Sequence, residues 1–311
     1  SAFGFDDVSA AEPTEFEVYY RAGDHEYRYA LSVHADEIVS EGLWRRKLGA
    51  SRTAMLFERE GAEVLLGPTL RKLVTAAKFN PSLPYLSFLC INFDVPVVKE
   101  AASWFLDGVF LNYNSSYLEQ MLEQLLDEDD SPEVTRFLRA VDVRIDGFRV
   151  ERAPEWRGQR VFVRHEVSGK AYELRLSEES AGTQKLMGLA AYLMTALERG
   201  GTVVVDELDA KLHPKLLRYV ILLFKDSEVN KSGAQLIFSS QDVSTMRNDV
   251  FRRDEIWFAA RGEGEASQLW SLADIHEGNG NLVSKNAAFD KQYLSGRYGA
   301  DPYLTRIEEW D

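Results

Sequence analysis

Alternating apolar and polar residues run from Thr14 to about Leu66 and set the pattern of the first part of the chain. The stretch TEFEVYYRAGDHEYRYALSV alternates on both sides of the turn-forming residues 22–24. Successive side chains of a strand point to opposite faces of a sheet, so this alternation is typical of a half-buried antiparallel sheet. It predicts a hairpin or a meander.

Helical spacing replaces this alternation between Leu70 and Ala140. The stretch SYLEQMLEQLLDEDD (116–130) predicts a helix that ends in a solvated acidic run. The stretch SPEVTRFLRAV (131–141) predicts a further helix, with Ser131 as its N-cap and Pro132 at its first position. Strand patterns then return at 143–151, 160–167 and 170–176.

The last part of the chain has an α/β pattern. A buried helix is predicted at 184–198 and another helix at 214–226, between apolar strands at 202–207, 234–240 and 254–261 and before an edge strand at 267–274. Strands that do not alternate and are separated by helices favour a parallel sheet covered on both faces. The predicted fold class is α/β, with a mixed or parallel core. Its three expected domains are an antiparallel β lobe (1–69), a helical insertion (70–142) and the α/β core (143–311).

Charge and cysteine content narrow the function classes. The chain of 311 residues carries 36 basic and 50 acidic residues, a net charge of −14, which argues against a general nucleic-acid or membrane surface. Cys90 is the only cysteine, so neither an intrachain disulfide nor a zinc site built from thiolates can form. No apolar run approaches the roughly 18 residues that a membrane helix needs, and we expect a cytoplasmic protein.

Two carboxylates, Asp206 and Glu207, follow directly after the apolar strand in GGTVVVDELDAKLHP (200–214). Ligands of open α/β sheets bind beyond the carboxyl ends of the strands. In nucleotide hydrolysis, the first carboxylate of such a pair holds Mg²⁺ and the second polarises the attacking water. The alternative is a helix-capping aspartate and a solvated glutamate at an ordinary strand exit.

The segment LSEESAGTQKL (176–186) comes immediately before the predicted buried helix. Ser180 can cap that helix, and Gly182 allows close backbone approach to an anion at the helix N-terminus. A plain serine cap with a flexible glycine is the alternative. Further along, Asp209 lies just past the carboxylate pair, and His213 is expected to be an N-cap or structural residue before Pro214.

Taken in order, these segments resemble the second half of an ABC-type ATPase head, with SAGTQK as signature motif, TVVVDE as Walker B strand and LDAKLHP as D-loop. The chain resembles more narrowly the ABC-like "AAA" ATPases encoded beside abortive-infection and restriction systems. The resemblance covers nearly the whole chain and is also carried by EPTEFEV (12–18), RRDEIWF (252–258) and YLSGRYGADP (293–302).

This resemblance implies a P-loop NTPase fold of ABC type, and an ATP hydrolase that dimerises with two ATP molecules sandwiched between its heads. Asp206 would be the Mg²⁺-associated carboxylate and Glu207 the general base. The residues that would serve the neighbouring head are Ser180, Gly182 and Thr183 at the phosphates and Asp209 across the interface. The implied cofactors are ATP and Mg²⁺. The implied partners are a second copy and a separate nuclease or toxin effector in antiphage defence.

The sequence departs from this family at two places. No G-x-x-x-x-G-K-[ST] loop is present; only Lys231 is followed by serine, with Asn230 in the place of the second glycine, so we expect a phosphate loop encoded upstream of Ser1. Gln241 stands at the position of the switch histidine and cannot carry its proton or charge. If the site is active, this predicts slow turnover and a long-lived ATP-bound dimer; otherwise Gln241 is simply a polar residue at a strand exit.

Two other functions are compatible with the residues: a degenerate, non-hydrolysing scaffold, and a DNA repair or recombination head. The acidic balance and short helical region disfavour the latter. The stretch WRRKLGASR (44–52) is either a basic patch or a solvated strand end. We also expect the segment around Arg297 to dock onto the head or to support its site.

Overall fold

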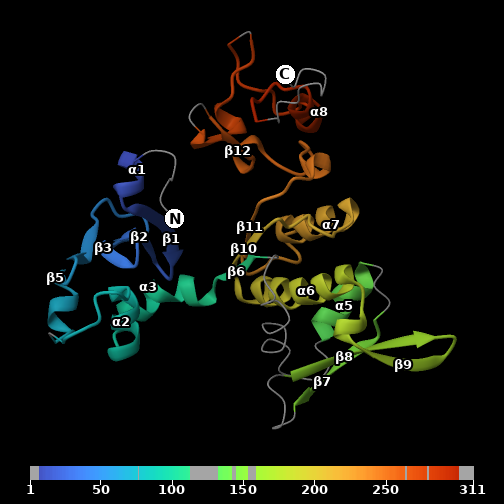
Figure 1. Ribbon diagram of the computed structural model, residues 1–311, viewed down its shortest axis with the longest axis horizontal. Coiled ribbons are helices and arrows are strands. Elements are labelled where there is room, and N and C mark those ends of the chain that lie inside the picture. Colours follow the sequence, from blue (N-terminus) through green and yellow to red (C-terminus); the bar gives the residue numbers. More distant parts are fainter. Residues whose placement is uncertain are drawn as a thin grey trace. The chain divides into compact units, whose positions relative to one another are not determined.

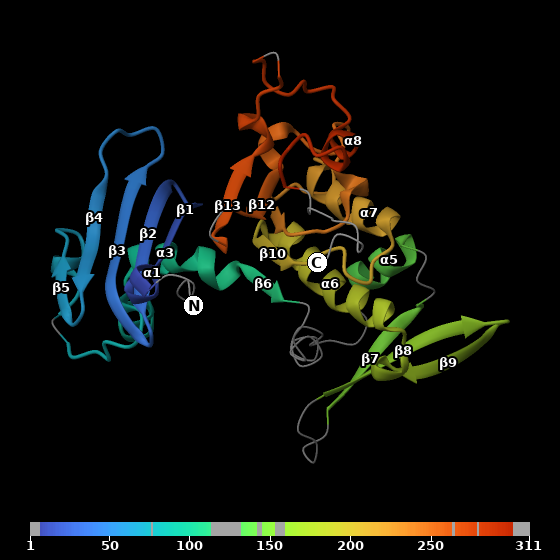
Figure 2. The ribbon, with the colours of Figure 1, turned by 45° about the horizontal axis from the view of Figure 1, so that its top comes forward.

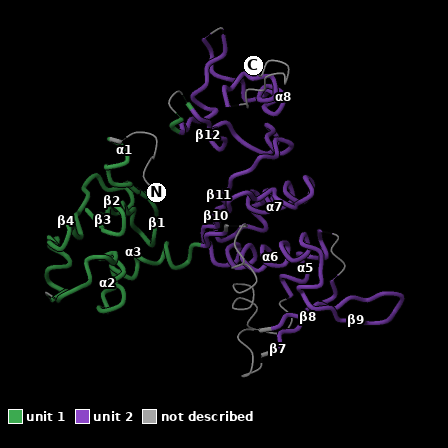
Figure 3. The backbone as a smooth tube through the Cα atoms, in the orientation of Figure 1, with its two compact units in different colours: residues 1–108, 262–266 green, residues 109–261, 267–311 purple. Residues whose placement is uncertain are grey.

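The computed structural model describes residues 7–75, 77–112, 132–141, 145–152, 159–262, 265–278 and 280–300. The chain divides into two compact units (Figure 3): residues 1–108 with 262–266, and residues 109–261 with 267–311. The predicted helix at 116–130 and the predicted N-cap Ser131 lie outside the described residues.

The first unit contains the predicted antiparallel sheet. After the short helix α1 (Asp7–Ala11), five strands pair in chain order: β1 (Thr14–Ala22), β2 (His25–His34), β3 (Glu37–Lys47), β4 (Ala54–Glu60) and β5 (Glu63–Leu66). A 3₁₀ turn (Leu70–Lys72) follows, and helices α2 (Tyr85–Asn92) and α3 (Pro96–Asp107) pack against one face of the sheet (Figures 1 and 2). The alternation between Thr14 and Leu66 therefore predicted this part correctly.

A buried carboxylate connects the sheet of this unit to helix α2. The Glu41 side chain is 0% exposed and accepts hydrogen bonds from the Tyr29 hydroxyl at 3.0 Å and from the backbone N–H groups of Tyr85 at 2.5 Å and Leu86 at 2.9 Å. Tyr85 and Leu86 begin α2, and the first N–H groups of a helix have no partner within the helix. Glu41 on β3 therefore caps α2.

Arg59 on β4 neutralises Glu41 and holds the segment that leads into α2. Its guanidinium, also 0% exposed, donates to the Glu41 carboxylate at 3.2 Å, to the Leu83 carbonyl at 2.8 Å and to the Pro81 carbonyl. Its Nε donates to the Gly61 carbonyl at 2.6 Å. Both buried charges are thus paired and hydrogen-bonded, as burial of ions requires.

The second unit is built on a short parallel sheet. Its strand order is β11 (Gln235–Phe238), β10 (Thr202–Asp206) and β6 (Val109–Asn112), with both pairs parallel. Helices α5 (Pro132–Ala140), α6 (Ala181–Arg199) and α7 (Pro214–Lys225) share its hydrophobic core (Figure 1). The predicted helices at 184–198 and 214–226 and the strands at 202–207 and 234–240 are therefore present.

The third strand of the parallel sheet differs from the prediction. Residues 254–261 were expected there, but β12 (Trp257–Arg261) pairs antiparallel with β13 (Ser267–Ser271) in a separate sheet. The residues of β12 alternate between exposed and less exposed positions. This alternation is hidden in the sequence because Trp257 is apolar although it faces solvent. The parallel position belongs to β6, whose four residues are too few for a strand pattern to stand out beside α3.

Two smaller elements complete the second unit. An antiparallel sheet of β7 (Gly147–Arg152), β8 (Gln159–Val167) and β9 (Lys170–Arg175) leads into α6. The β12–β13 hairpin and helix α8 (Phe289–Leu294) enclose a separate apolar cluster that includes Phe258 and Tyr298. The Trp270 indole N–H donates to the Tyr298 carbonyl at 3.2 Å, so the described part of the tail docks as expected.

The division into units differs from the three predicted domains. Residues 70–142 were expected to form one helical insertion, but α2 and α3 belong to the first unit, whereas β6 and α5 belong to the second. The reason is packing: Leu89 and Val98 join the core of the N-terminal sheet, and Leu138 joins the core around α6. The assignment of the predicted segments to functional domains stays a prediction.

Candidate functional site

The predicted carboxylate pair lies at the carboxyl edge of the parallel sheet. Asp206 is the last residue of β10 and is exposed. The Ser239 hydroxyl, directly after β11, donates to Asp206 Oδ1 at 2.5 Å and accepts from the Glu207 backbone N–H at 2.8 Å. Ser239 therefore holds both carboxylate residues in place, and it was not recognised from the sequence.

The turn that follows contains two residues in a left-handed conformation that neither favours. Glu207 has φ of 53° and Lys211 has φ of 62°. Such backbone is uncommon outside glycine and asparagine and persists where the surroundings fix it, often at functional sites. Here the surroundings are a 3.0 Å hydrogen bond from the Leu208 N–H to the Ser239 carbonyl and the complete burial of the Leu208 side chain.

The N-terminus of α6 has the serine cap that the sequence predicted. Ser180 is the N-cap, and its hydroxyl accepts from the Thr183 N–H at 3.1 Å and contacts the Thr183 hydroxyl at 2.9 Å. A Cβ atom placed on Gly182 would lie 3.5 Å from the Lys211 carbonyl oxygen, an ordinary contact. The start of α6 thus lies against the turn that carries Glu207.

Lys185 joins these two segments and was also missed from the sequence. Its side chain is buried, and the ammonium donates to the backbone carbonyls of Glu207 at 3.4 Å, Leu208 at 3.3 Å and Ala210. Burial lowers the Lys185 pKa to about 8, with Asp209 acting in the opposite direction. A cation directly before the apolar run LMGLAAYLMTAL was the available signal, because a buried ammonium needs several acceptors.

The shifted pKa predicts how stability depends on pH. Between pH 8 and the ordinary 10.5, the unfolded chain keeps the Lys185 proton while the folded chain releases it, so stability rises with pH across this window. Relative to Lys185→Met, the wild type should gain about 3 kcal/mol of unfolding free energy between these pH values. Urea unfolding of both proteins at several pH values measures this, with Lys231→Met at an exposed position as the control. A pH-independent difference would contradict the burial of a titrating ammonium.

Asp209 and Gln241 meet next to this turn. The Gln241 backbone N–H lies 3.3 Å from each Asp209 carboxylate oxygen. Asp209 therefore ties the turn to the segment after β11, and the exposed Gln241 stands at the same sheet edge as Asp206. The roles of these two residues in switching and in communication between heads stay predictions.

The oxygen atoms at this edge fit a magnesium ion that shares its coordination with phosphates. Among the described residues, no group of three His, Cys, Asp or Glu side chains could hold a metal by itself. Mg²⁺ in nucleotide sites typically takes only one or two protein oxygens and completes its shell with phosphates and water. The exposed Asp206 carboxylate, oriented by the Ser239 hydroxyl, suits that arrangement.

The remaining predicted residues have local roles. His213 is the N-cap of α7, and its Nδ1 accepts from the Lys215 N–H at 3.2 Å, which confirms the structural interpretation. Asn230 and Lys231 lie between α7 and β11, where the Asn230 side chain bonds the Phe224 and Ala234 carbonyls. For Arg297, the backbone N–H donates to the Gln292 carbonyl at 3.1 Å, and support of the site by its side chain stays a prediction.

A family described as "AAA domain, putative AbiEii toxin, Type IV TA system" matches residues 2–247. No curated protein matches the chain. None of the helices among the described residues combines the length and apolar character needed to cross a membrane.

Three solved structures of SMC proteins are similar to the chain. The SMC head domain from Thermotoga maritima is 13% identical, with 80% of this chain and 74% of that chain covered and a TM-score of 0.33. An SMC head bound to the C-terminal winged-helix domain of ScpA is 14% identical, with the same coverage and a TM-score of 0.34. A structure from work on ATP-driven dimerisation and DNA-stimulated activation of SMC ATPases is 17% identical, covers 45% of this chain and 83% of its own, and has a TM-score of 0.31.

The family match decides the assignment. It spans 246 residues, from 2 to 247, out of 311, and includes the signature segment, the β10 strand with its carboxylates, and the antiparallel sheet. The fold is accordingly a mixed α/β P-loop NTPase fold with parallel and antiparallel sheets. This chain therefore belongs to the family of AAA domains described as putative AbiEii toxin, type IV toxin–antitoxin system.

Proposed function

We propose that the chain is an ATP-hydrolysing head that closes with a second copy around ATP and Mg²⁺ and thereby controls an effector in antiphage defence. The observation that carries the proposal is the sheet edge at which Ser239 orients Asp206 and Glu207 together. Family membership supports an ATPase linked to toxin–antitoxin systems. ATP hydrolysis by this chain, its dimer and its effector are our proposal.

The two carboxylates have different tasks in this proposal. Asp206, exposed and fixed by the Ser239 hydroxyl, would hold Mg²⁺, which when bound neutralises phosphate charge. Glu207 would accept the proton of the attacking water. The Glu207 backbone is fixed by its left-handed conformation and by the hydrogen bond from its N–H to the Ser239 hydroxyl, and this fixes the point from which the carboxylate extends. General bases need this kind of positioning, because proton transfer requires hydrogen-bond reach to the water.

The start of α6 would serve the ATP molecule held by the neighbouring copy. A 19-residue helix presents unpaired N–H groups and positive dipole charge at its N-terminus, which favours a phosphate. Ser180 would add its hydroxyl, and Gly182, which has no side chain, would allow the backbone to come close to the phosphate. Among the described residues, no hydrogen bond or ion pair links Ser180 to Asp206 or Glu207 of the same chain.

Lys185 would connect these two tasks. It extends from the signature helix to the carbonyls of Glu207, Leu208 and Ala210. A small displacement of α6 on contact with a second head would therefore act on the backbone of the proposed general base. Lys185 is a positioning residue in this account and touches neither nucleotide nor water.

Two substitutions at Ser180 test the dimer. Asp and Asn are both good N-caps, so Ser180→Asp and Ser180→Asn should keep α6 intact. Only the aspartate places a negative charge against the phosphate. In light scattering of the natural full-length protein with Mg-ATP, Ser180→Asp should raise the dimer dissociation constant at least about tenfold, and Ser180→Asn should stay closer to the wild type.

The proposal fails if ATP does not change the mass of the wild type, or if Ser180→Asp associates as well as the wild type. Circular dichroism of both variants controls for folding. Dimerisation without ATP hydrolysis would instead support the scaffold, the second candidate function, which the glutamine at the switch position favours. In that case Gln241→His should leave hydrolysis absent.

A further inference from the structure

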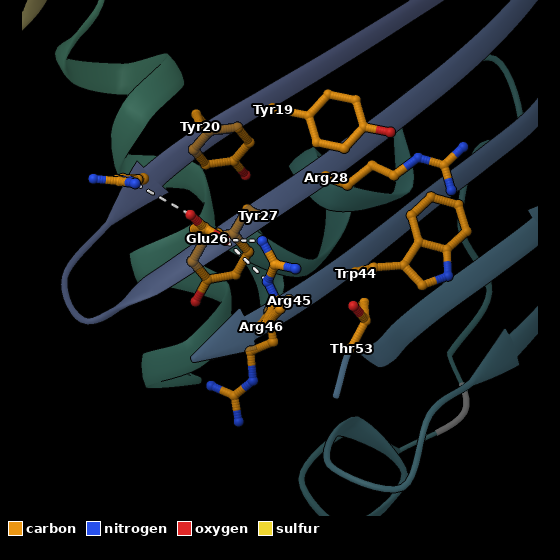
Figure 4. Close-up of a pocket in the computed structure, with 10 residues that line it drawn as sticks. Tyr19, Tyr20, Glu26, Tyr27, Arg28, Trp44, Arg45, Arg46 and Thr53 are labelled. Carbon is orange, nitrogen blue, oxygen red and sulfur yellow. Dashed lines mark hydrogen bonds and ion pairs between the residues drawn. The ribbon is translucent and has the colours of Figure 1, made fainter. Parts of the chain in front are cut away.

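The first unit has an unusual surface on the sheet face that α2 and α3 leave open. Strand residues alternate between the two faces, and Tyr20 and Tyr27 point into the core beneath the helices. Their neighbours Tyr19 and Arg28 therefore lie on the open face. Together with Trp44 they line a pocket of about 340 Å³ (Figure 4).

One row of this face combines two aromatic rings with an arginine. Tyr19, Arg28 and Trp44 are direct cross-strand neighbours on β1, β2 and β3. The Arg28 guanidinium lies 4.5 Å from the centre of the Trp44 ring and is bound to Glu17 at 2.5 Å. The Tyr19 side chain has no such cover and is 70% exposed. The row thus presents a free ring beside a fixed arginine–tryptophan stack.

The chain makes room for the tryptophan to lie along the sheet. Gly42 lies two residues before Trp44 on β3, on the same face. A Cβ atom on Gly42 would lie 2.1 Å from Cη2 of the Trp44 ring, closer than atoms can approach. The indole therefore lies over the Gly42 backbone, and a flat ring on a sheet is a surface for stacking.

A second row carries the positive charge. Arg21, Glu26 and Arg46 are cross-strand neighbours, and Glu26 accepts from Arg46 Nε at 2.9 Å and from Arg21 at 3.3 Å. Arg45 is the cross-strand partner of Tyr27 and lies on the opposite face. On the open face the three arginines 21, 28 and 46 exceed the two paired glutamates, 17 and 26, by one charge, in a chain whose net charge is −14.

We propose that this face binds a single-stranded nucleic acid. Bases would stack on Tyr19 and on the Arg28–Trp44 pair, and phosphates would contact the row that contains Arg21 and Arg46. Sequence-tolerant single-strand binding uses this combination of aromatic or guanidinium planes with arginines along the backbone. The acidic remainder of the chain would repel a polyanion and confine it to this patch. The stretch 44–52, left open between a basic patch and a strand end, supplies part of both rows.

Fluorescence anisotropy with labelled 20-nucleotide single-stranded DNA and RNA tests the proposal on the full chain. The wild type should bind at 50 mM salt, and Tyr19→Ala and Trp44→Ala should each weaken binding roughly tenfold. Arg21→Gln should lower the salt slope by about one. Matched controls are Tyr172→Ala and Trp257→Ala, which are 51% and 57% exposed in the second unit, and Arg247→Gln. Gly42→Ala should weaken binding by displacing Trp44.

Two competitors identify the ligand. A duplex of the same sequence should compete poorly, since its bases are stacked on one another and cannot reach the rings. Free ATP, which offers the same base and phosphate chemistry, should also compete poorly. No binding by the wild type, equal binding by the folded Tyr19→Ala and Trp44→Ala variants, or preference for duplex or ATP would overturn the proposal. Glu207→Gln should bind the oligonucleotide like the wild type, so this result is independent of the ATPase proposal.

Discussion

Replacement of Glu207 by glutamine is expected to lower ATP hydrolysis by at least about 100-fold, because a glutamine amide cannot take the proton of the attacking water. The amide keeps the size of the side chain, and the Ser239 contact uses the Glu207 backbone N–H. Binding of ATP and closure of the dimer should therefore persist. The variant should accumulate as an ATP-bound dimer in light scattering while phosphate release nearly stops.

A control for this variant is available on the same unit. Glu228 is exposed, and Glu228→Gln removes the same charge away from the sheet edge. It should hydrolyse ATP at the wild-type rate. Equal hydrolysis by wild type and Glu207→Gln would show that Glu207 is not the general base.

The variant Gln241→His should raise turnover if the missing histidine limits the rate. Unchanged hydrolysis would contradict that idea.

The largest effect on stability is expected from Arg59→Met. It leaves the Glu41 carboxylate fully buried without its cation and removes the donors to the Gly61, Leu83 and Pro81 carbonyls. Breaking a buried pair by removal of one partner costs about 3–5 kcal/mol. Urea unfolding monitored by hydrogen exchange should show this loss in peptides from β2 to α2. Peptides from β10 should keep their protection.

Two further variants separate the buried charge from general damage. Arg218→Met breaks an ion pair with Asp249 whose side chains are 36% and 49% exposed, and it should cost less than about 1 kcal/mol. The double variant Glu41→Gln/Arg59→Met should be less destabilised than the sum of the two single variants, because no unpaired charge remains. Strict additivity would show that the two side chains do not act as a pair.

The sequence predicted those features that depend on long patterns or local chemistry. The alternation in the first unit and the apolar run of β10 are both long, so both elements were placed correctly. Ser180 as an N-cap depends only on its own hydroxyl and the next turn of helix, so it too could be predicted. The positions of Asp206 and Glu207 at a sheet edge follow from the strand they end.

Contacts between distant segments could not be read in the same way. Ser239 forms its hydrogen bonds with residues more than 30 positions earlier in the chain. Nothing in the stretch SSQD distinguishes it from the polar residues around it. The left-handed backbone of Glu207 and Lys211 lacks the usual glycine signal because tertiary contacts impose it. Strand β6 was missed because four residues cannot display a period.

The sequence did contain a usable signal for the buried pair of Glu41 and Arg59. Glu41 stands two positions before Leu43 on the same strand, so it shares the inward face with a leucine that is 0% exposed. A carboxylate at an inward position needs a buried partner. The sequence does not say which arginine provides it, since Arg59 is 18 residues away on the next strand.

In the proposed dimer, each ATP is held between Asp206 and Glu207 of one head and Ser180 of another. Mixing Ser180→Asp with Glu207→Gln tests it most directly, since each variant alone should hydrolyse almost no ATP. A mixed dimer contains one site with both substitutions and one site with neither. An equimolar mixture should therefore regain hydrolysis that neither variant shows alone. A mixture no more active than the sum of its components would show that Ser180 and Glu207 of different heads do not share one ATP site.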